Sequence, residues 1–592
     1  MKNVSKISLA LLSGLLIAAS WPTSGFTPLI FIAFVPLIFL EDNKTTRQQD
    51  NKKDNIFLFS FLTFLVWNTL TTWWVWNSTP AGSIAMILLN STFMATTFWL
   101  YHITRKKIFH NKGGFFLLIL FFLAFENLHL TWQLNWPWLN IGNVFSHNHT
   151  WVQWYEFTGT AGGTIWVLLA NILAYKVIKR LQALVSEPVE GKNQDLGTST
   201  SSVTEQNPHT LNSSTPHTLN SSVPQFLKSS TPQFLKSSTP QLLSSSVPQF
   251  LSSSYPQILL FLAVVLVPII ASKIMYHSYK EKGEEVEVVV AQPNIDPWKE
   301  EFRLRASEIL NRNFSVAEPL ITENTRFVVS PESTIHESIW LEKIKFYRSI
   351  NESKLFSRNN NITYIVGAST LGMAYDKDDF AARKFHDADE YYYSYNTALS
   401  INDTADIQIH QKSRLTPGVE MMPSWWFLRP IKNLAIDLGG TVGTLKSEDT
   451  VTVFDYGKYK VAPMICYESV FGGYVTDFVR NGANMIFVIT NDGWWGDTPG
   501  HRQHFEMSKL RAIENRRSVA RSANTGISGF INQRGDVVEC SNYWEPTALR
   551  NTINVNDEMT FYSRHGDYIY RAASFIAILV LCFTFLISIK KK

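Results

Sequence analysis

Three residues of different chemical types, Glu332, Lys412 and Cys466, each lie where polar residues end an expected strand. A cysteine is an effective nucleophile only as its thiolate. A nearby carboxylate can remove the thiol proton as general base, and an ammonium group can stabilise the oxyanion that forms when the thiolate attacks an acyl carbonyl. Together these residue types predict covalent catalysis on an acyl group, without help from a histidine.

Each residue alone has a simpler interpretation. Glu332 fits a carboxylate at a helix N-terminus, Lys412 a solvated lysine, and Cys466 a buried, inert thiol. The other two cysteines, Cys540 and Cys582, are expected to be dispensable and unreactive. Three cysteines in 592 residues exclude a disulfide framework and a multi-cysteine metal site, so no metal is expected.

The order and spacing of the three residues resemble a known triad. Glu332 and Lys412 are 80 positions apart, and Lys412 and Cys466 are 54 apart, which is similar to the Glu-Lys-Cys triad of the nitrilase superfamily. A nitrilase-like domain placed between two membrane helices resembles one family, apolipoprotein N-acyltransferase, over nearly the whole chain except 181–255. Further similar motifs are Gln292-Pro293-Asn294-Ile295, Ser330-Pro331-Glu332-Ser333, Ile465-Cys466-Tyr467-Glu468, Asn491-Asp492-Gly493-Trp494-Trp495-Gly496 and Arg521-Ser522-Ala523-Asn524-Thr525-Gly526.

This resemblance implies a ping-pong transfer without a cofactor. Cys466 is the nucleophile, Glu332 the general base and Lys412 the oxyanion stabiliser. The implied donor is a phospholipid, and the implied acceptor is the α-amine of the N-terminal diacylglyceryl-cysteine of an apolipoprotein. The reaction would be the last step of lipoprotein maturation, carried out by a monomer.

Five further residues receive supporting roles from the same resemblance. Glu420 would hold Lys412 or Glu332, or share the role of base, and Tyr467 and Glu468 would support the turn at the nucleophile. Trp494 and Trp298 would wall the acyl chamber. Core packing, a structural ion pair and plain aromatic burial remain alternatives for Tyr467, Glu468 and Trp298. The chain departs from the family pattern at 416–420 and at Ser330, where a Trp is usual.

The residues between 278 and 570 are expected to form the catalytic domain, an α-β-β-α sandwich. Expected strands and helices alternate in it, and polar residues at strand ends gather at one edge of a sheet. The expected strands are 286–291, 327–330, 364–367, 461–465 and 485–490, and two expected helices are 303–314 and 503–517.

The remaining sequence is largely apolar and predicts about eight membrane helices, since a span needs about 20 apolar residues. The predicted spans are 7–21, 26–40, 56–76, 82–101, 113–128, 160–178, 256–277 and 571–589. The first two are short, and the first also fits a signal peptide, with Lys2 and Lys6 before an apolar run.

Basic residues predict the orientation of these spans. The loops at 41–55 and 102–112 and the C-terminal tail are rich in Lys and Arg, whereas the loops at 77–81 and 129–159 contain neither. The basic loops are therefore expected in the cytoplasm, with the catalytic domain on the periplasmic side of a bacterial inner membrane. The loop at 129–159 holds five Trp, which predicts an interfacial aromatic belt or a loop close to a lipid-handling site.

Residues 181–255 contain a repeat of eight residues that resembles Pro-Gln-Phe-Leu-Lys-Ser-Ser-Thr. Proline at every eighth position excludes a long helix, and the Ser/Thr/Gln-rich composition favours a disordered linker. A docking segment is the alternative interpretation.

The overall composition is an average over these unlike parts. Charged residues make up 17% of the chain and the mean hydropathy is −0.04, which excludes an ordinary cytosolic enzyme. A net charge of +4 gives no indication of nucleic-acid binding. A membrane-anchored amidase or hydrolase of the nitrilase type, and a non-enzymatic channel or scaffold, are the competing functional classes.

Overall fold

The computed structural model describes residues 5–46, 55–110, 112–186, 247–404, 406–422, 424 and 444–590. The chain forms two units, one comprising Met1–Lys176 with Gln257–Lys592 and the other Val177–Pro256. The second unit contains the whole predicted linker, 181–255, of which residues 187–246 lie outside the described part of the chain.

Apolar helices occupy the N-terminal part of the chain, and two more precede and follow the β-sheet domain in sequence. They are α1 (Lys6–Ser20), α2 (Val35–Thr46), α3 (Ile56–Thr72), α4 (Pro80–Phe109), α5 (Phe116–Thr131), α7 (Thr160–Ser186), α8 (Val247–Ser278) and α14 (Tyr568–Lys590). Within the described residues, five helical segments are long and apolar enough to cross a membrane: Ile56–Asn77, Pro80–Phe109, Thr160–Ala183, Tyr255–Ser278 and Tyr568–Lys590. Helices α1 and α5 are apolar but shorter.

The predicted second span, 26–40, is not one helix. A 3-10 helix over Thr27–Phe31 is followed by α2, which begins only at Val35 and continues to Thr46. Proline lacks an amide hydrogen and fits the first turn of a helix but not its interior, so Pro36 favours a new helix start at this point. The prediction of eight continuous spans is therefore wrong at this segment.

Two β-sheets form the centre of the catalytic domain. The first has the order β14-β1-β2-β4-β6-β5, with β3 beside β4 and β7 beside β6. Its strands are β1 (Glu284–Gln292), β2 (Thr325–Val329), β3 (Ile335–Trp340), β4 (Thr363–Ala374), β5 (Arg383–Lys384), β6 (Tyr391–Ile401), β7 (Gln408–Gln411) and β14 (Thr547–Val555). The second sheet has the order β13-β12-β11-β10-β9-β8. Its strands are β8 (Phe454–Tyr456), β9 (Tyr459–Ile465), β10 (Met485–Thr490), β11 (Val519–Ala523), β12 (Gly529–Ile531) and β13 (Val537–Cys540).

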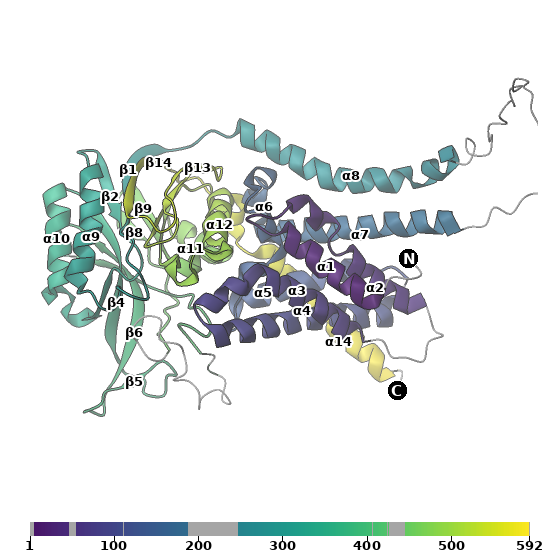
Figure 1. Ribbon diagram of the computed structural model, residues 1–592, viewed down its shortest axis with the longest axis horizontal. Coiled ribbons are helices and arrows are strands. Elements are labelled where there is room, and N and C mark those ends of the chain that lie inside the picture. The colour runs from purple at the N-terminus through teal and green to yellow at the C-terminus, as the bar shows by residue number, and fades with distance from the viewer. Residues whose placement is uncertain are drawn as a thin grey trace, which may run out of the picture. The chain divides into compact units, whose positions relative to one another are not determined.

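The two sheets pack face to face, and helices cover their outer faces. Successive side chains of a strand point to opposite faces. In β1, Val288 and Val290 accordingly join the core between the sheets, while Val289 and Ala291 join the core beneath α9 (Ala306–Ala317) and α10 (Arg348–Asn360). Figure 1 shows α9 and α10 on one side of the sheets, with α11 (Gly472–Arg480) and α12 (Pro499–Asn515) on the other. This is the predicted α-β-β-α sandwich.

Polar and aromatic contacts join the apolar helices to the catalytic domain. The indole of Trp138, from the Trp-rich loop after α5, donates to Gln503 Oε1 of α12 at 2.8 Å. Trp138 is only 1% exposed and packs against Trp74 and Trp495, with ring centroids 5.1 and 5.7 Å away. Trp138, one of the tryptophans of the predicted aromatic belt, is therefore buried in an intramolecular contact between this loop and α12.

Candidate active site

The three predicted catalytic residues come from separate strand ends and line one cavity. Glu332 follows β2, Lys412 follows β7 and Cys466 follows β9. All three contribute to a cavity of about 850 Å³. Gly367 of β4 lies so close to the turn at Glu332 that a Cβ atom there would be 2.6 Å from the Glu332 Cα, so a side chain at Gly367 would displace the carboxylate.

Lys412 is buried between two carboxylates. Its Nζ is 3.1 Å from Glu332 Oε1 and 2.8 Å from Glu420 Oε1. The amide of Asn396, in β6, donates to the same two oxygens at 2.8 and 3.1 Å. The backbone N–H of Asn491 donates to Glu332 Oε2 at 3.1 Å. Five polar groups thus fix one another in a buried network.

The electrostatics of this network set the protonation of the lysine and the cysteine. Burial by itself lowers the pKa of Lys412, but Glu332 and Glu420 raise that pKa well above its usual value, so the ammonium form persists. Burial, followed by the charge of Glu332, raises the pKa of the Cys466 thiol well above its usual value, although Lys412 opposes this. Cys466 is therefore a neutral thiol at rest, and an attack by its sulfur would need a base.

Cys466 lies at a sharp turn. It starts a short 3-10 helix, Cys466–Val470, and its φ of 51° is in the left-handed region that non-glycine residues rarely adopt. Buried Glu468 holds this turn, because its carboxylate accepts from the N–H groups of Ile465 at 2.9 Å and Ser413 at 2.7 Å. Burial alone would raise the pKa of Glu468, yet His410 and these backbone donors lower it, so Glu468 is a carboxylate.

The other predicted site residues take different positions. Glu420 reaches Lys412 from the divergent loop at 416–420, where its Oε2 accepts from Thr416 N at 2.8 Å. Tyr467 lines the cavity and donates to the Asn135 carbonyl at 3.2 Å, which ties the turn to the Trp-rich loop. Trp494 lines the cavity, whereas Trp298 is 53% exposed and packs edge-on against Trp494 at 4.7 Å without lining it.

Sequence reasoning did not single out four polar residues of this site. Asn396 lies inside a strand and His504 inside a helix, where neither belongs to a recognised motif. Asn491 is the first residue of the Asn491–Gly496 motif, but its hydrogen bond to Glu332 forms only in the folded chain. Glu301 is buried beside this network, where Asn491 Nδ2 donates to Glu301 Oε2 at 2.7 Å. A charged residue in a turn carries no sequence signal for burial.

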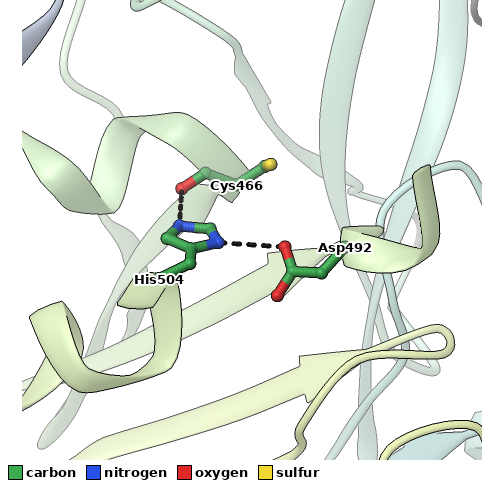
Figure 2. A group of neighbouring side chains, drawn as sticks. All are labelled: Cys466, Asp492 and His504. Carbon is green, nitrogen blue, oxygen red and sulfur yellow. Dashed lines mark hydrogen bonds and ion pairs between the residues drawn. The ribbon is translucent and has the colours of Figure 1, made fainter. Parts of the chain in front are cut away.

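Cys466, Asp492 and His504 form a cluster that could in principle hold a metal ion, with their ligand atoms within 4.8 Å of one another (Figure 2). Here the imidazole and the carboxylate are already engaged. His504 Nδ1 is 2.9 Å from Asp492 Oδ1, and Arg521 donates to Asp492 Oδ2 at 2.6 Å. A cation would have to displace the buried guanidinium, so the donor set fits a hydrogen-bond network better than a metal centre.

Comparisons with known proteins match both parts of the chain. The apolipoprotein N-acyltransferase N-terminal domain matches residues 13–173, and the carbon-nitrogen hydrolase domain matches residues 350–559, which include Lys412 and Cys466 but not Glu332.

Two curated relatives align with nearly the whole chain. An apolipoprotein N-acyltransferase of Chlorobaculum tepidum is 24% identical over 95% of this chain and 93% of its own length. A relative of the same name from Geobacter metallireducens is 23% identical over 94% of this chain and 91% of its own. Over nearly its whole length, the chain is therefore similar to apolipoprotein N-acyltransferases.

Proposed function

We propose that this protein transfers an acyl chain from a phospholipid to the α-amine of the N-terminal diacylglyceryl-cysteine of apolipoproteins. The observation that carries the proposal is the position of Glu332, Lys412 and Cys466 in one cavity, whose other walls come from apolar helices and tryptophans. A thiol that lines a largely apolar cavity fits a substrate with a long acyl chain.

In the first half-reaction, Glu332 takes the proton of the Cys466 thiol, and Sγ attacks the carbonyl carbon of the phospholipid ester. Lys412 stabilises the resulting oxyanion. The ester C–O bond then breaks, and Glu332 returns the proton to the glycerol oxygen. A lysophospholipid leaves, and the acyl chain remains on Cys466 as a thioester.

In the second half-reaction, the α-amine of the lipoprotein cysteine attacks the thioester carbonyl. Glu332 takes a proton from the amine, and the C–S bond breaks as the amide forms. The proton then returns to Sγ, which restores the thiol. Glu420 acts here by holding Lys412, since its Oε1 is 2.8 Å from Nζ and its Oε2 is engaged by the loop backbone.

We further propose that both substrates reach Cys466 laterally from the periplasmic leaflet of the inner membrane. Leu89 of α4 lines the cavity and is also 43% exposed on the apolar face of that helix. Entry along such a face avoids moving acyl chains through water, which costs about 0.8 kcal/mol for each CH₂ group.

A labelled-donor assay tests this function. Purified protein receives phospholipid with a radiolabelled acyl chain, with and without a diacylglyceryl lipopeptide. We expect label on Cys466 without the peptide and on the peptide amine with it. Label released only as free fatty acid would establish the alternative, a membrane-anchored hydrolase.

Two cysteine variants complete the assay. Cys466→Ala should form no thioester, whereas Cys540→Ala, which alters an exposed thiol, should react as the wild type does. A thioester that persists in Cys466→Ala would refute the assignment of the nucleophile.

A further inference from the structure

The backbone carbonyl of Cys466 is held by two side chains. The Ser469 hydroxyl donates to this oxygen at 2.8 Å, and His504 Nε2 lies 3.2 Å from it (Figure 2). His504 belongs to α12 and is fully buried. A left-handed φ at a cysteine persists only where its surroundings enforce it, and these two contacts are enforcing groups at the nucleophile itself.

His504 Nε2 faces two groups of the turn, 3.2 Å from the Cys466 carbonyl oxygen and 3.0 Å from Ser469 Oγ. A carbonyl oxygen only accepts hydrogen bonds, so the imidazole donates to Cys466 in the tautomer that carries its hydrogen on Nε2, and Ser469 Oγ can accept from the same Nε2–H. On the other side, Nδ1 lies 2.9 Å from Arg521 Nη2 and 2.9 Å from Asp492 Oδ1. Arg521 donates to Nδ1 when the ring is neutral, and Asp492 accepts from Nδ1–H when the ring is charged. Burial and Arg521 lower the pKa of His504, which favours the neutral ring.

A fixed carbonyl also fixes the amide on the other side of the same peptide bond. The Cys466–Tyr467 peptide is planar and trans, so the Tyr467 N–H points opposite to the Cys466 carbonyl, away from His504 and Ser469. Tyr467 is the second residue of the 3-10 helix, where an N–H has no acceptor within the helix. Such a donor beside the nucleophile is suited to bind an oxyanion.

We propose that His504 is a positioning residue for acyl transfer, which sets the Cys466–Tyr467 peptide plane through its bond to the Cys466 carbonyl and thereby aims the Tyr467 N–H at the oxyanion. Arg521 and Asp492 hold the imidazole for this task. The inference rests on the proposed thioester chemistry, and what it adds is the role of His504 in orienting the peptide that follows the nucleophile.

Two substitutions of His504 test the proposal in single-turnover formation of the Cys466 thioester from phospholipid. His504→Leu removes the donor, and we expect a rate constant at saturating lipid that is about 100-fold lower, comparable with the loss of one oxyanion donor. The lipid concentration at half-saturation should not change. His504→Gln supplies an N–H at similar reach, and we expect it to recover at least about tenfold of that loss with the wild-type pH profile.

Two controls separate positioning from general damage. His501, also buried and three residues earlier in α12, contacts Asp497 and not the turn, so His501→Leu should form the thioester at the wild-type rate. Alkylation of Cys466 by iodoacetamide builds no oxyanion, so His504→Leu should alkylate as the wild type does while thioester formation is slow.

Several results would overturn the proposal. The first is a wild-type rate of thioester formation in His504→Leu, and the second is a change only in the lipid concentration at half-saturation. The others are a His504→Gln variant that is as slow as His504→Leu, and a loss of Cys466 alkylation in His504→Leu as large as the loss of thioester formation. Absence of the thioester in the wild-type protein would instead refute the proposed function.

Discussion

Glu301 offers a direct test of the buried electrostatics beside Glu332. Burial, with a smaller contribution from the charge of Glu332, raises the pKa of Glu301 from 4.5 to about 8. One pKa unit corresponds to about 1.4 kcal/mol, so this rise represents roughly 5 kcal/mol between the protonated and ionised forms. At neutral pH the folded protein therefore keeps a proton on Glu301 that the unfolded chain has released.

The sign of the stability effect follows from proton counting. Between pH 4.5 and about 8 the folded state binds more protons at this group, so stability falls as pH rises and the loss levels off above about 8. Glu301→Gln is isosteric, cannot ionise, and retains an oxygen to accept from Asn491. We expect its unfolding free energy relative to wild type to increase by about 3 to 4 kcal/mol between pH 5 and pH 8.

Thermal denaturation of both proteins in detergent at several pH values measures this difference. The Tm of Glu301→Gln should exceed that of the wild type by a margin that widens with pH. Glu300 is a matched control, because its hydrogen bond with Arg312 lowers its pKa, and Glu300→Gln should differ from the wild type by a constant amount over this range. A margin for Glu301→Gln that does not change between pH 5 and 8 would refute a buried, protonated Glu301.

Three further predictions concern the network around Cys466. Lys412→Met leaves Glu332 and its neighbouring carboxylate without a counter-ion, so we expect a loss of about 3–5 kcal/mol in unfolding free energy, measured by denaturant titration; unchanged stability would contradict the buried ion pairs. Glu332→Gln should slow iodoacetamide alkylation of Cys466 about 100-fold, because the thiol then lacks its base, and should leave Cys540 unaffected; equal slowing at both sites would argue against a specific base. Glu468→Gln should cost about 1.5–3 kcal/mol above pH 5, because charge-assisted bonds are lost. The lowered pKa of Glu468 makes that cost shrink as pH falls below its unfolded value near 4.5, and a cost that grows at low pH would contradict this assignment.

The sandwich domain and the long apolar helices could both be predicted from the pattern of apolar and polar residues along the sequence. Alternating apolar strands and intervening helices indicated the sandwich, because burial on both faces of β1 requires an uninterrupted apolar run. Apolar runs of sufficient length indicated the long helices α3, α4, α7, α8 and α14. The predicted span 26–40 missed the break between the 3-10 helix at Thr27–Phe31 and α2. Pro36 marks this break, but a mean hydropathy over the whole segment does not detect where the backbone leaves the helix.

The sequence by itself determined the chemical types at the candidate site: a thiol, a carboxylate and an ammonium group, each at the end of a strand. Only the tertiary structure decided how those groups are held. Asn396 of β6 and Asn491, which follows β10, reach Glu332, and His504 of α12 reaches the Cys466 carbonyl. Hydrogen bonds and buried charges act over a few ångströms of space, and separation along the chain does not reveal which side chains folding brings within that distance.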